Sequence, residues 1–283
     1  MNYRHAFHAG NFADVFKHAV VTRVLVHLKE KVSAFRVIDT HAGAGLYDLA
    51  GPEARRTLEW KSGIGRLRSV TLAEPIRSLL SPYLDIVAAL NTDGDLRRYP
   101  GSPTLALRLL RPQDRLLASE LEPKTAAILR RSIGADKRAS VVEIDGWTAL
   151  NAYIPPIERR GLVIVDPAYE DSDEFARLAE SFEGAYGKWP SGIYVLWYPI
   201  KTRTAPQALA RRLHKIGIAK VLRAELLVEA TNDAGRLIGA GLIVVNPPWK
   251  LHQELKMLLP ALADVLGQGA GAGFALDWVA GEK

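Results

Sequence analysis

The sequence Gly161-Leu-Val-Ile-Val165, followed at once by Asp166-Pro-Ala-Tyr169, is the strongest indication of the fold in this chain. A short apolar run without alternation is typical of a strand buried on both faces, as in a parallel sheet covered by helices. The acid, proline and aromatic residue that follow it are expected at the carboxyl edge of the sheet, where open α/β sheets bind ligands. The stretch therefore predicts a buried parallel strand and a candidate site together.

The residues after this strand suit a flat base that carries an amino group. The Asp166 carboxylate can accept a hydrogen bond from an exocyclic amine, the Pro167 carbonyl can accept a second, and the Tyr169 ring can lie against the base. These are the needs of an enzyme that methylates the amino group of a nucleobase. The alternative is a strand that ends in an ordinary proline turn, because four residues are a short motif.

Strand-like and helical segments alternate on both sides of this stretch, which predicts a parallel sheet covered by helices. The expected strands are 35–39, 114–119, 140–144, 161–165 and 192–198, and the expected helices are 12–31, 103–110, 123–133, 146–152 and 173–186. Segments 219–229 and 238–246 are joined too closely for a crossover helix, so they predict an antiparallel hairpin. A helix at 249–266 and a strand at 273–279 follow. The fold class is therefore α/β, with the outline of a Rossmann-like methyltransferase sheet.

Composition narrows the classes of function. The 283 residues are 48% hydrophobic and 24% charged, and none is a cysteine, which excludes disulfides and thiolate chemistry and fits a cytoplasmic protein. No signal peptide and no apolar run of about 20 residues is present, so a soluble protein is expected. The net charge of +6 predicts a polyanionic partner, although paired cations such as Arg159-Arg160 are also common at solvated helix ends.

A second polar site is expected where Phe35-Arg-Val-Ile-Asp39 runs into Thr40-His-Ala-Gly43-Ala-Gly45. Glycines after a strand let the backbone approach a ligand closely. The next strand ends in Glu120, the candidate to bind ribose hydroxyls, with Glu74 as a weaker alternative because it precedes a helix. The third strand ends in Asp145-Gly146, where an acid can bind an adenine amino group.

The spacing of these acids predicts an insertion. Glu120 follows Asp39 by 81 residues, whereas about 20 are usual between the corresponding positions of a dinucleotide-binding fold. Residues 47–101 supply the excess, with a helical pattern at 75–90, so they are expected to form a small helical subdomain beside the catalytic edge. Residues 1–46 and 102–283 would then form the Rossmann-like domain, beginning with a polar, aromatic tail and a helix.

A competing tetrapeptide stands at Asn246-Pro-Pro-Trp249. Its composition matches the pattern of amino-methyltransferases better than residues 166–169 do. Its strand, however, is expected to be the antiparallel member of the hairpin, so its carboxyl end would point to the edge opposite the cofactor. We therefore interpret it as a strand-to-helix turn. The histidines at 5, 8, 18 and 41 lack cysteines and an HExxH helix, so no metal site is expected.

Motifs shared with one known family run along the whole chain in the same order. They are Tyr3-Arg-His5, Phe7-His-Ala-Gly-Asn11, Ala13-Asp14, Lys17-His18, Asp39-Thr-His-Ala-Gly-Ala-Gly45, Tyr99-Pro-Gly-Ser-Pro103, Asp145-Gly146, Gly161 to Glu170, Leu196-Trp-Tyr-Pro199 and Asn246-Pro-Pro-Trp-Lys250. On these motifs the chain resembles the RlmJ-type family of 23S ribosomal RNA adenine-N6 methyltransferases.

The resemblance implies a reaction and roles for the site residues. S-adenosylmethionine would be the methyl donor, and one adenine of 23S ribosomal RNA would be methylated at N6 by a class I methyltransferase. Carried over by motif, the donor-binding residues would be His18, His41, Gly43, Ser102, Glu120, Asp145, Gly146 and Asp166. Asp166, Pro167 and Tyr169 would be catalytic, and Tyr3, His5 and Lys17 would contact the substrate.

One residue departs from the pattern of the family, and two alternatives stay open. The family's tetrapeptide resembles Asp-Pro-Pro-Tyr, whereas this chain has Ala168; the Pro167 carbonyl remains, so activity with a looser loop is expected. An adenine-N6 DNA methyltransferase is disfavoured because no separate target-recognition domain is apparent. A non-catalytic RNA-binding protein is disfavoured because Asp39, Glu120, Asp145 and Asp166 are all intact. The expected partner is 23S ribosomal RNA, with no membrane, no stable protein partner and a monomeric state.

Overall fold

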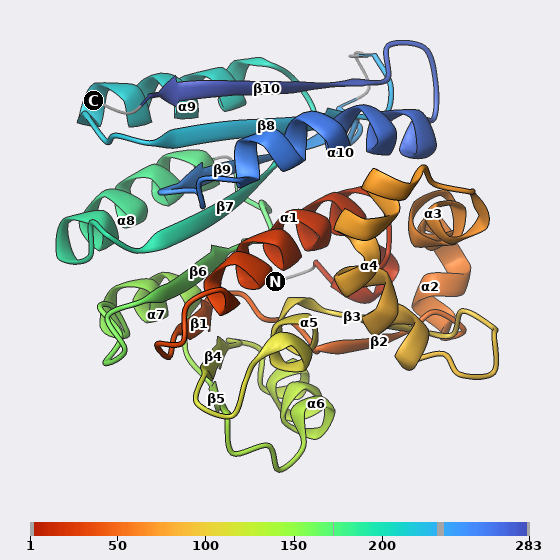
Figure 1. The fold of residues 1–283 in the computed structure, drawn as a ribbon, viewed down its shortest axis with the longest axis horizontal. Coiled ribbons are helices and arrows are strands. Elements are labelled where there is room, and N and C mark those ends of the chain that lie inside the picture. Colours follow the sequence, from red (N-terminus) through yellow and green to blue (C-terminus); the bar gives the residue numbers. More distant parts are fainter. Residues whose placement is uncertain (1–2, 172, 231–234, 282–283) are drawn as a thin grey trace.

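The central element of the fold is an eight-stranded sheet. The computed structural model describes residues 3–171, 173–230 and 235–281, and its strand order is β10-β8-β9-β7-β6-β1-β4-β5 (Figure 1). The strands are β1 (Arg36–Asp39), β4 (Arg115–Ser119), β5 (Ala139–Val142), β6 (Gly161–Val165), β7 (Ile193–Ile200), β8 (Val221–Leu227), β9 (Gly239–Val245) and β10 (Gly273–Ala280).

Strand directions follow the sequence-based expectation. β5, β4, β1, β6 and β7 are parallel, whereas β9 runs antiparallel to both β7 and β8. β10 adds a further antiparallel strand beside β8. All five residues of β6 are buried, because helices cover both faces of the sheet around it. The predicted α/β class with a Rossmann-like methyltransferase sheet is confirmed.

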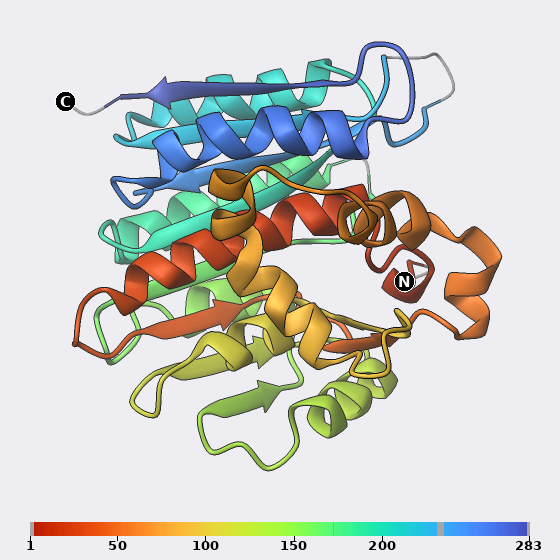
Figure 2. The ribbon, with the colours of Figure 1, turned by 45° about the vertical axis from the view of Figure 1, so that its right-hand side comes forward.

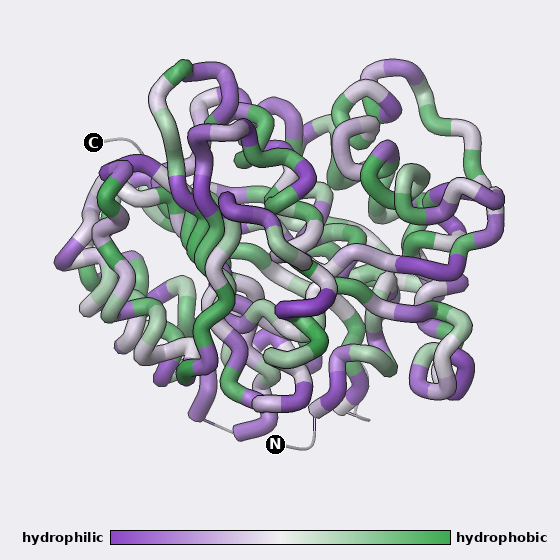
Figure 3. The backbone as a smooth tube through the Cα atoms, turned by 90° about the horizontal axis from the view of Figure 1, so that it is seen from below, coloured by the Kyte–Doolittle hydropathy of each residue, from purple (hydrophilic) through white to green (hydrophobic). Residues whose placement is uncertain are grey.

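Helices cover the two faces in separate hydrophobic clusters. On one face lie α1 (Phe12–Lys29), α5 (Ser102–Leu109) and α10 (Leu251–Leu266), and on the other lie α7 (Gly146–Ala152), α8 (Glu174–Lys188) and α9 (Thr204–Ile216). α6 (Pro123–Ile133) contributes Leu129 to the first cluster. α9, which was not among the expected helices, connects β7 to β8. In Figure 3 the strands at the centre are mainly hydrophobic, which fits a sheet buried between these layers.

The segment between β1 and β4 contains the expected extra elements. β2 (Leu46–Asp48) and β3 (Arg98–Pro100) pair antiparallel at its base, and between them lie α2 (Pro52–Thr57), the π-helical segment η2 (Lys61–Gly65), α3 (Arg66–Ser69) and α4 (Glu74–Ala89). Figure 2 shows these elements beside α1. Ile64, Tyr83 and Val87 share a hydrophobic cluster with α1, so the segment and α1 have a continuous core.

α1 is buried along nearly its whole length, so its polar side chains lie inside the protein beside the candidate site. Asn11 caps its first turn by accepting hydrogen bonds from the amides of Ala13 and Asp14, both at 3.0 Å. Because the sheet, α4, α5 and α10 surround the helix, its polar residues Asp14, Lys17 and His18 are also buried. Buried charges of this kind are stable only when they are paired. Within the described residues, no helix is both long and apolar enough to cross a membrane.

Candidate active site

The candidate site lies where β1, β4 and β6 end. Asp39 is the last residue of β1, Glu120 follows β4 and Asp166 follows β6. The register pairs Asp39 with Ala118 of β4 and with Ile164 of β6, so the three acids are at the same edge of adjacent parallel strands. The N-terminal segment approaches this edge through the 3-10 turn η1 (His5–Phe7).

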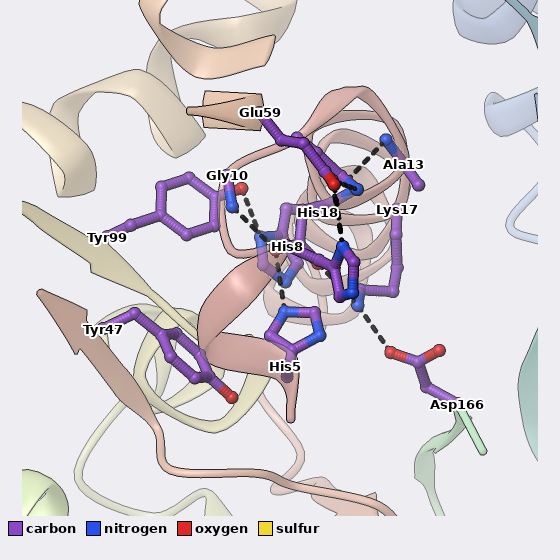
Figure 4. Close-up of polar contacts among 12 residues, drawn as sticks. His5, His8, Gly10, Ala13, Lys17, His18, Tyr47, Glu59, Tyr99 and Asp166 are labelled. Carbon is purple, nitrogen blue, oxygen red and sulfur yellow. Dashed lines mark hydrogen bonds and ion pairs between the residues drawn. The ribbon is translucent and has the colours of Figure 1, made fainter. Parts of the chain in front are cut away.

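A buried lysine binds the carboxylate of Asp166. Lys17 Nζ donates to Asp166 Oδ2 at 2.5 Å and to Asp14 Oδ1 at 2.9 Å (Figure 4). The Lys17 side chain is 5% exposed and that of Asp166 is 15% exposed. Among the described residues Asp166 Oδ1 accepts no hydrogen bond, so one oxygen is anchored while the other remains available.

The charges of this network stabilise one another. Burial alone lowers the pKa of Lys17, but the carboxylates of Asp14 and Asp166 outweigh it and hold that pKa well above its usual value. Burial alone raises the pKa of Asp14, but His5 and Lys17 outweigh it and hold that pKa well below its usual value. Lys17 is therefore a cation and Asp14 an anion at neutral pH, and together they fix the Asp166 side chain.

The N-terminal segment extends this network toward the surface. His5 Nε2 lies 2.9 Å from Asp14 Oδ2, and the Tyr3 hydroxyl lies 2.8 Å from His5 Nδ1. The Tyr3 ring stacks on His8 with a centroid distance of 5.5 Å, and its amide donates to Glu170 Oε1 at 2.5 Å. The segment thus spans from α1 to the loop after β6, beside Asp166.

His8 ties the N-terminal segment to the residues inserted between β1 and β4. Its Nδ1 lies 3.0 Å from both carboxylate oxygens of Glu59, and Asn11 Nδ2 donates to Glu59 Oε2 at 3.0 Å. The hydrogen bond to Glu59 raises the pKa of His8 above its ordinary value, against the lowering effect of burial. A backbone hydrogen bond from Ile64 N to Gly10 O, at 2.9 Å, adds to this connection.

The glycine turn after β1 is held by Glu120. Glu120 Oε2 accepts from the Gly43 amide and Oε1 accepts from the Glu122 amide, both at 2.9 Å. Burial raises the pKa of Glu120. Gly43 has a φ of +62°, and an added Cβ would lie 2.3 Å from the Tyr47 hydroxyl, so only glycine fits there. The turn forms a narrow backbone cradle beside the acid.

Two buried side chains in this region, Asp39 and His18, have polar atoms without a hydrogen-bond partner among the described residues. Both carboxylate oxygens of Asp39, and Nε2 of His18, are buried without a hydrogen bond among the described residues. Burial raises the pKa of Asp39 to about 7, more than offsetting the lowering effect of Ser102 and of the His41 amide. Burial lowers the pKa of His18 to about 3, so its imidazole is neutral, with Nδ1 bound to the Tyr99 hydroxyl at 2.8 Å. Orphaned polar atoms at a strand end fit a polar ligand.

Asp145 and Gly146 border the same site through His41. The His41 ring meets Trp147 edge-on at 5.1 Å, and a Cβ on Gly146 would lie 2.3 Å from Thr40 O. Burial lowers the pKa of His41 to about 4, so it too is neutral. Asp145 caps α7 by accepting from Thr148 N at 2.9 Å. β5 ends at Val142, so Asp145 follows the strand end by three residues.

Tyr169 is already packed on the protein. Its hydroxyl donates to Trp197 O at 2.9 Å, and its ring lies 4.9 Å from Phe175 and 5.7 Å from Trp197. The residue is half-buried and has a φ of +52°. This turn holds the ring beside Asp166 in one orientation.

The competing tetrapeptide is at the other edge. β9 is antiparallel to β7, and Asn246 Nδ2 donates to Pro190 O and Gly192 O, both at 2.8 Å. Those carbonyls precede β7, so Asn246 lies at the amino ends of the parallel strands. The interpretation of residues 246–249 as a turn away from the site is confirmed.

Two residues of the network were absent from the sequence-based site. Asp14 was named only within a motif shared with the family, although its spacing of three from Lys17 on an apolar helix is a usable signal. Glu59 has no such signal, because its contact with His8 depends on how the inserted residues pack. In the described ranges, no three His, Asp or Glu side chains cluster as metal ligands would.

Sheet order and the position of the acids define a protein of the Rossmann-like methyltransferase class. A sequence model described as "Ribosomal RNA large subunit methyltransferase D, RlmJ" matches residues 32–280. The chain belongs to this family, as its motifs predicted. It is 41% identical to the "Ribosomal RNA large subunit methyltransferase J" of Escherichia coli (strain K12) and 39% identical to that of Haemophilus influenzae, over the full length of all three chains.

Solved structures agree with this assignment. A protein from Legionella pneumophila superposes with a TM-score of 0.86 at 33% identity, covering 95% of this chain and 98% of that one. A probable spermidine synthase from Corynebacterium glutamicum has a TM-score of 0.51 at 14% identity, over 94% of this chain and 76% of the other. The second similarity shows a shared fold only.

Proposed function

We propose that this protein transfers a methyl group from S-adenosylmethionine to N6 of one adenine in 23S ribosomal RNA. Family membership supports methylation of large-subunit ribosomal RNA. The observation that carries the finer proposal is the Asp166 carboxylate at the end of β6, with one oxygen bound to Lys17 and the other available. In the part of the chain that the structure describes, the Pro167 carbonyl also accepts no hydrogen bond. Two acceptors on adjacent residues match the two N–H groups of an exocyclic amine.

The residues around β1 fit the methyl donor. S-adenosylmethionine would supply an electrophilic methyl group on a sulfonium. The Gly43 turn would lie against it, Glu120 would accept from ribose hydroxyls, and Asp145 would accept from the adenine amino group of the donor. Asp39, His18, His41 and Ser102 would contact its remaining polar groups. The unpartnered buried oxygens of Asp39 support this, since a bound ligand would satisfy them.

Asp166 and Pro167 would prepare the acceptor nitrogen. The adenine ring withdraws the N6 lone pair, and two hydrogen bonds from the amine return electron density to nitrogen and favour a pyramidal geometry. N6 then forms its bond to carbon as the carbon–sulfur bond breaks, and the cationic amine releases a proton to solvent. Positioning and electrostatics supply most of the acceleration.

Lys17, Tyr3 and His5 would support the acceptor site. Lys17 would hold the Asp166 carboxylate in one orientation, and Tyr3 and His5 would cover the base. Tyr169 would present a fixed ring to the base. The residues between β1 and β4 would form a small subdomain beside this edge that grips the RNA.

Labelled donor provides the test. The protein would be incubated with undermethylated 23S ribosomal RNA, with duplex DNA and with no nucleic acid, and the modified nucleotide would be mapped. Label at N6 of one adenine in the RNA is the expected result. Label only in DNA would support a DNA methyltransferase, and no label in any substrate would support a non-catalytic RNA-binding protein.

A further inference from the structure

The edge of the sheet opposite the site carries positive charge that the proposed reaction does not use. We define this amino edge as residues 29–36, 110–115, 134–139, 153–161, 188–192, 217–220 and 246–250, which lie at the amino ends of the parallel strands. In Figure 2 the arrowheads of β1 and β4 point away from it, toward the N-terminal segment.

Charge on the amino edge exceeds that of the whole protein. Its segments contain twelve Lys and Arg and four Asp and Glu, a formal charge of +8, whereas the whole chain has +6. The remainder of the chain therefore has a formal charge of −2. The basic character of this protein is therefore a property of one edge and not of its surface in general. Positive charge that is concentrated on one face is typical of a site that binds a polyanion.

The most exposed large apolar side chains lie on the same edge. Among the described residues these are Val32 and Ile157, each 88% exposed, and Trp249, 80% exposed, while the next, Leu121, is 53% exposed. Lys250 Nζ lies 5.0 Å from the Trp249 ring centroid. An exposed indole beside a cation offers a surface on which a nucleobase can stack.

Two arginines hold part of this edge in a fixed shape. Arg111 donates to Lys31 O at 2.7 Å, and Arg111 and Arg160 each donate to Ser33 O at 3.0 Å. Both guanidiniums lie over the buried Phe35 ring, at 5.5 and 5.7 Å. The loop 30–35 is thereby anchored through its backbone while Lys31 and Val32 point into solvent.

We propose that the amino edge binds a second segment of the RNA substrate, distinct from the one that presents the adenine. The identity of that RNA rests on the proposed function. β6 has five residues and β7 has eight, which at about 3.3 Å per residue separates the two edges by roughly 17–26 Å. Nucleotides bound at Asp166 are therefore not the ones that reach the amino edge. A long RNA can contact both edges, and a short oligonucleotide around the adenine cannot.

The test compares RNA lengths in one charge-reversal variant. Lys31→Glu, Lys137→Glu and Arg159→Glu together alter three exposed cations of the amino edge. With full-length undermethylated 23S ribosomal RNA, we expect KM to rise roughly tenfold and the slope of log affinity against log salt to become shallower by at most about 3. With a short oligonucleotide around the adenine, KM and kcat should not change.

A matched control places the same charge change elsewhere. The control variant carries Arg211→Glu, Arg236→Glu and Lys256→Glu, at side chains that are exposed on α9, shortly before β9 and on α10, and it should bind both RNAs like the wild type. Equal losses in the two variants, or equal losses on long and short RNA, would overturn the proposal. Binding of both RNAs is also measured by mobility shift, so the amino edge is tested even if no methylation is detected, which would count against the proposed function alone.

Discussion

Two similar tetrapeptides lie at opposite edges of one sheet. Asp166-Pro-Ala-Tyr169 follows the parallel strand β6, and Asn246-Pro-Pro-Trp249 follows β9, which is antiparallel to β7. Each begins with an acid or amide, continues with proline and ends with an aromatic residue. Only the first reaches the carboxyl edge, because strand direction decides which edge a strand end occupies. The direction of the preceding strand must therefore be inferred before a motif of this kind is assigned a role.

Their surroundings differ as much as their positions. Asp166 binds a buried lysine, whereas the Asn246 amide joins two backbone carbonyls in a neutral turn. The Tyr169 ring packs on Phe175 and Trp197, whereas Trp249 is 80% exposed. In the first tetrapeptide the carboxylate and the ring are held by neighbouring residues, whereas the second closes a turn and leaves its ring mostly exposed to solvent.

The largest expected difference in activity is between alanine variants of the first residue of each tetrapeptide, Asp166 and Asn246. Asp166→Ala removes the carboxylate proposed to accept from N6, so methylation should fall by about 10³-fold or more while the fold persists. Asn246→Ala should keep full activity on a short RNA but lower the free energy of unfolding by about 1–2 kcal/mol, because two hydrogen bonds are lost. Labelled-donor incorporation and thermal unfolding measure both. Wild-type turnover in Asp166→Ala would end the proposed mechanism.

Most of the fold was predictable from local sequence. The buried strand 161–165, the first-turn prolines Pro103 and Pro123, and the short hairpin connection each carry a local signal. α9 also carries such a signal, with Leu209, Leu213 and Ile216 on one face, although it is not among the expected helices. The β2–β3 pair was not predictable, because its strands are three residues each and pair across about fifty residues of intervening chain.

The site was predictable only in part. Acids at the ends of β1, β4 and β6 follow from strand order, since parallel strands bring their carboxyl ends to one edge. The pairing of Lys17 with Asp166 crosses 149 residues, and no periodicity predicts it. The contact between His8 and Glu59 likewise depends on the packing of α1 against η2. Long-range polar contacts of this kind need the tertiary structure.

The second prediction compares the two aromatic residues. Tyr169→Ala should lower kcat/KM by roughly 5- to 150-fold, the worth of one base stacked on an aromatic ring. Tyr169→Phe keeps the ring and loses only the hydrogen bond to Trp197, so it should retain most activity and lose about 0.5–1.5 kcal/mol of stability. Trp249→Ala should not change activity on a short RNA. If Tyr169→Ala retained full activity, the ring would have no contact with the base.

The third prediction exchanges the residues that distinguish the tetrapeptides. Ala168→Pro makes residues 166–169 resemble 246–249 and should stabilise the protein by about 0.4–1 kcal/mol, because a proline restricts the unfolded chain. No hydrogen bond among the described residues is donated by the Ala168 amide, so none is lost. Pro248→Ala should have the opposite effect on stability. A fall in activity of Ala168→Pro would show that Pro167 needs a conformation that a following proline forbids.

The smallest effect is a pH dependence confined to the edge that carries Asp166. His8, whose folded pKa is raised above the unfolded value of 6.5 by Glu59, contributes stability that is complete below pH 6.5 and is lost as pH rises through the raised value. The pKa of Glu59 is lowered from its ordinary value of 4.5. Glu59 therefore loses its charge, and with it this contribution to stability, only at acidic pH. Glu59→Gln should therefore lower the unfolding midpoint more at pH 6 than at pH 9, by a small margin because both side chains are partly exposed. Glu158→Gln, which breaks the pair with Arg36 at the amino edge, should lower the midpoint equally at both pH values, since this pair contains no histidine. An equal response of the two variants would show that His8 is not protonated in the folded protein at pH 6.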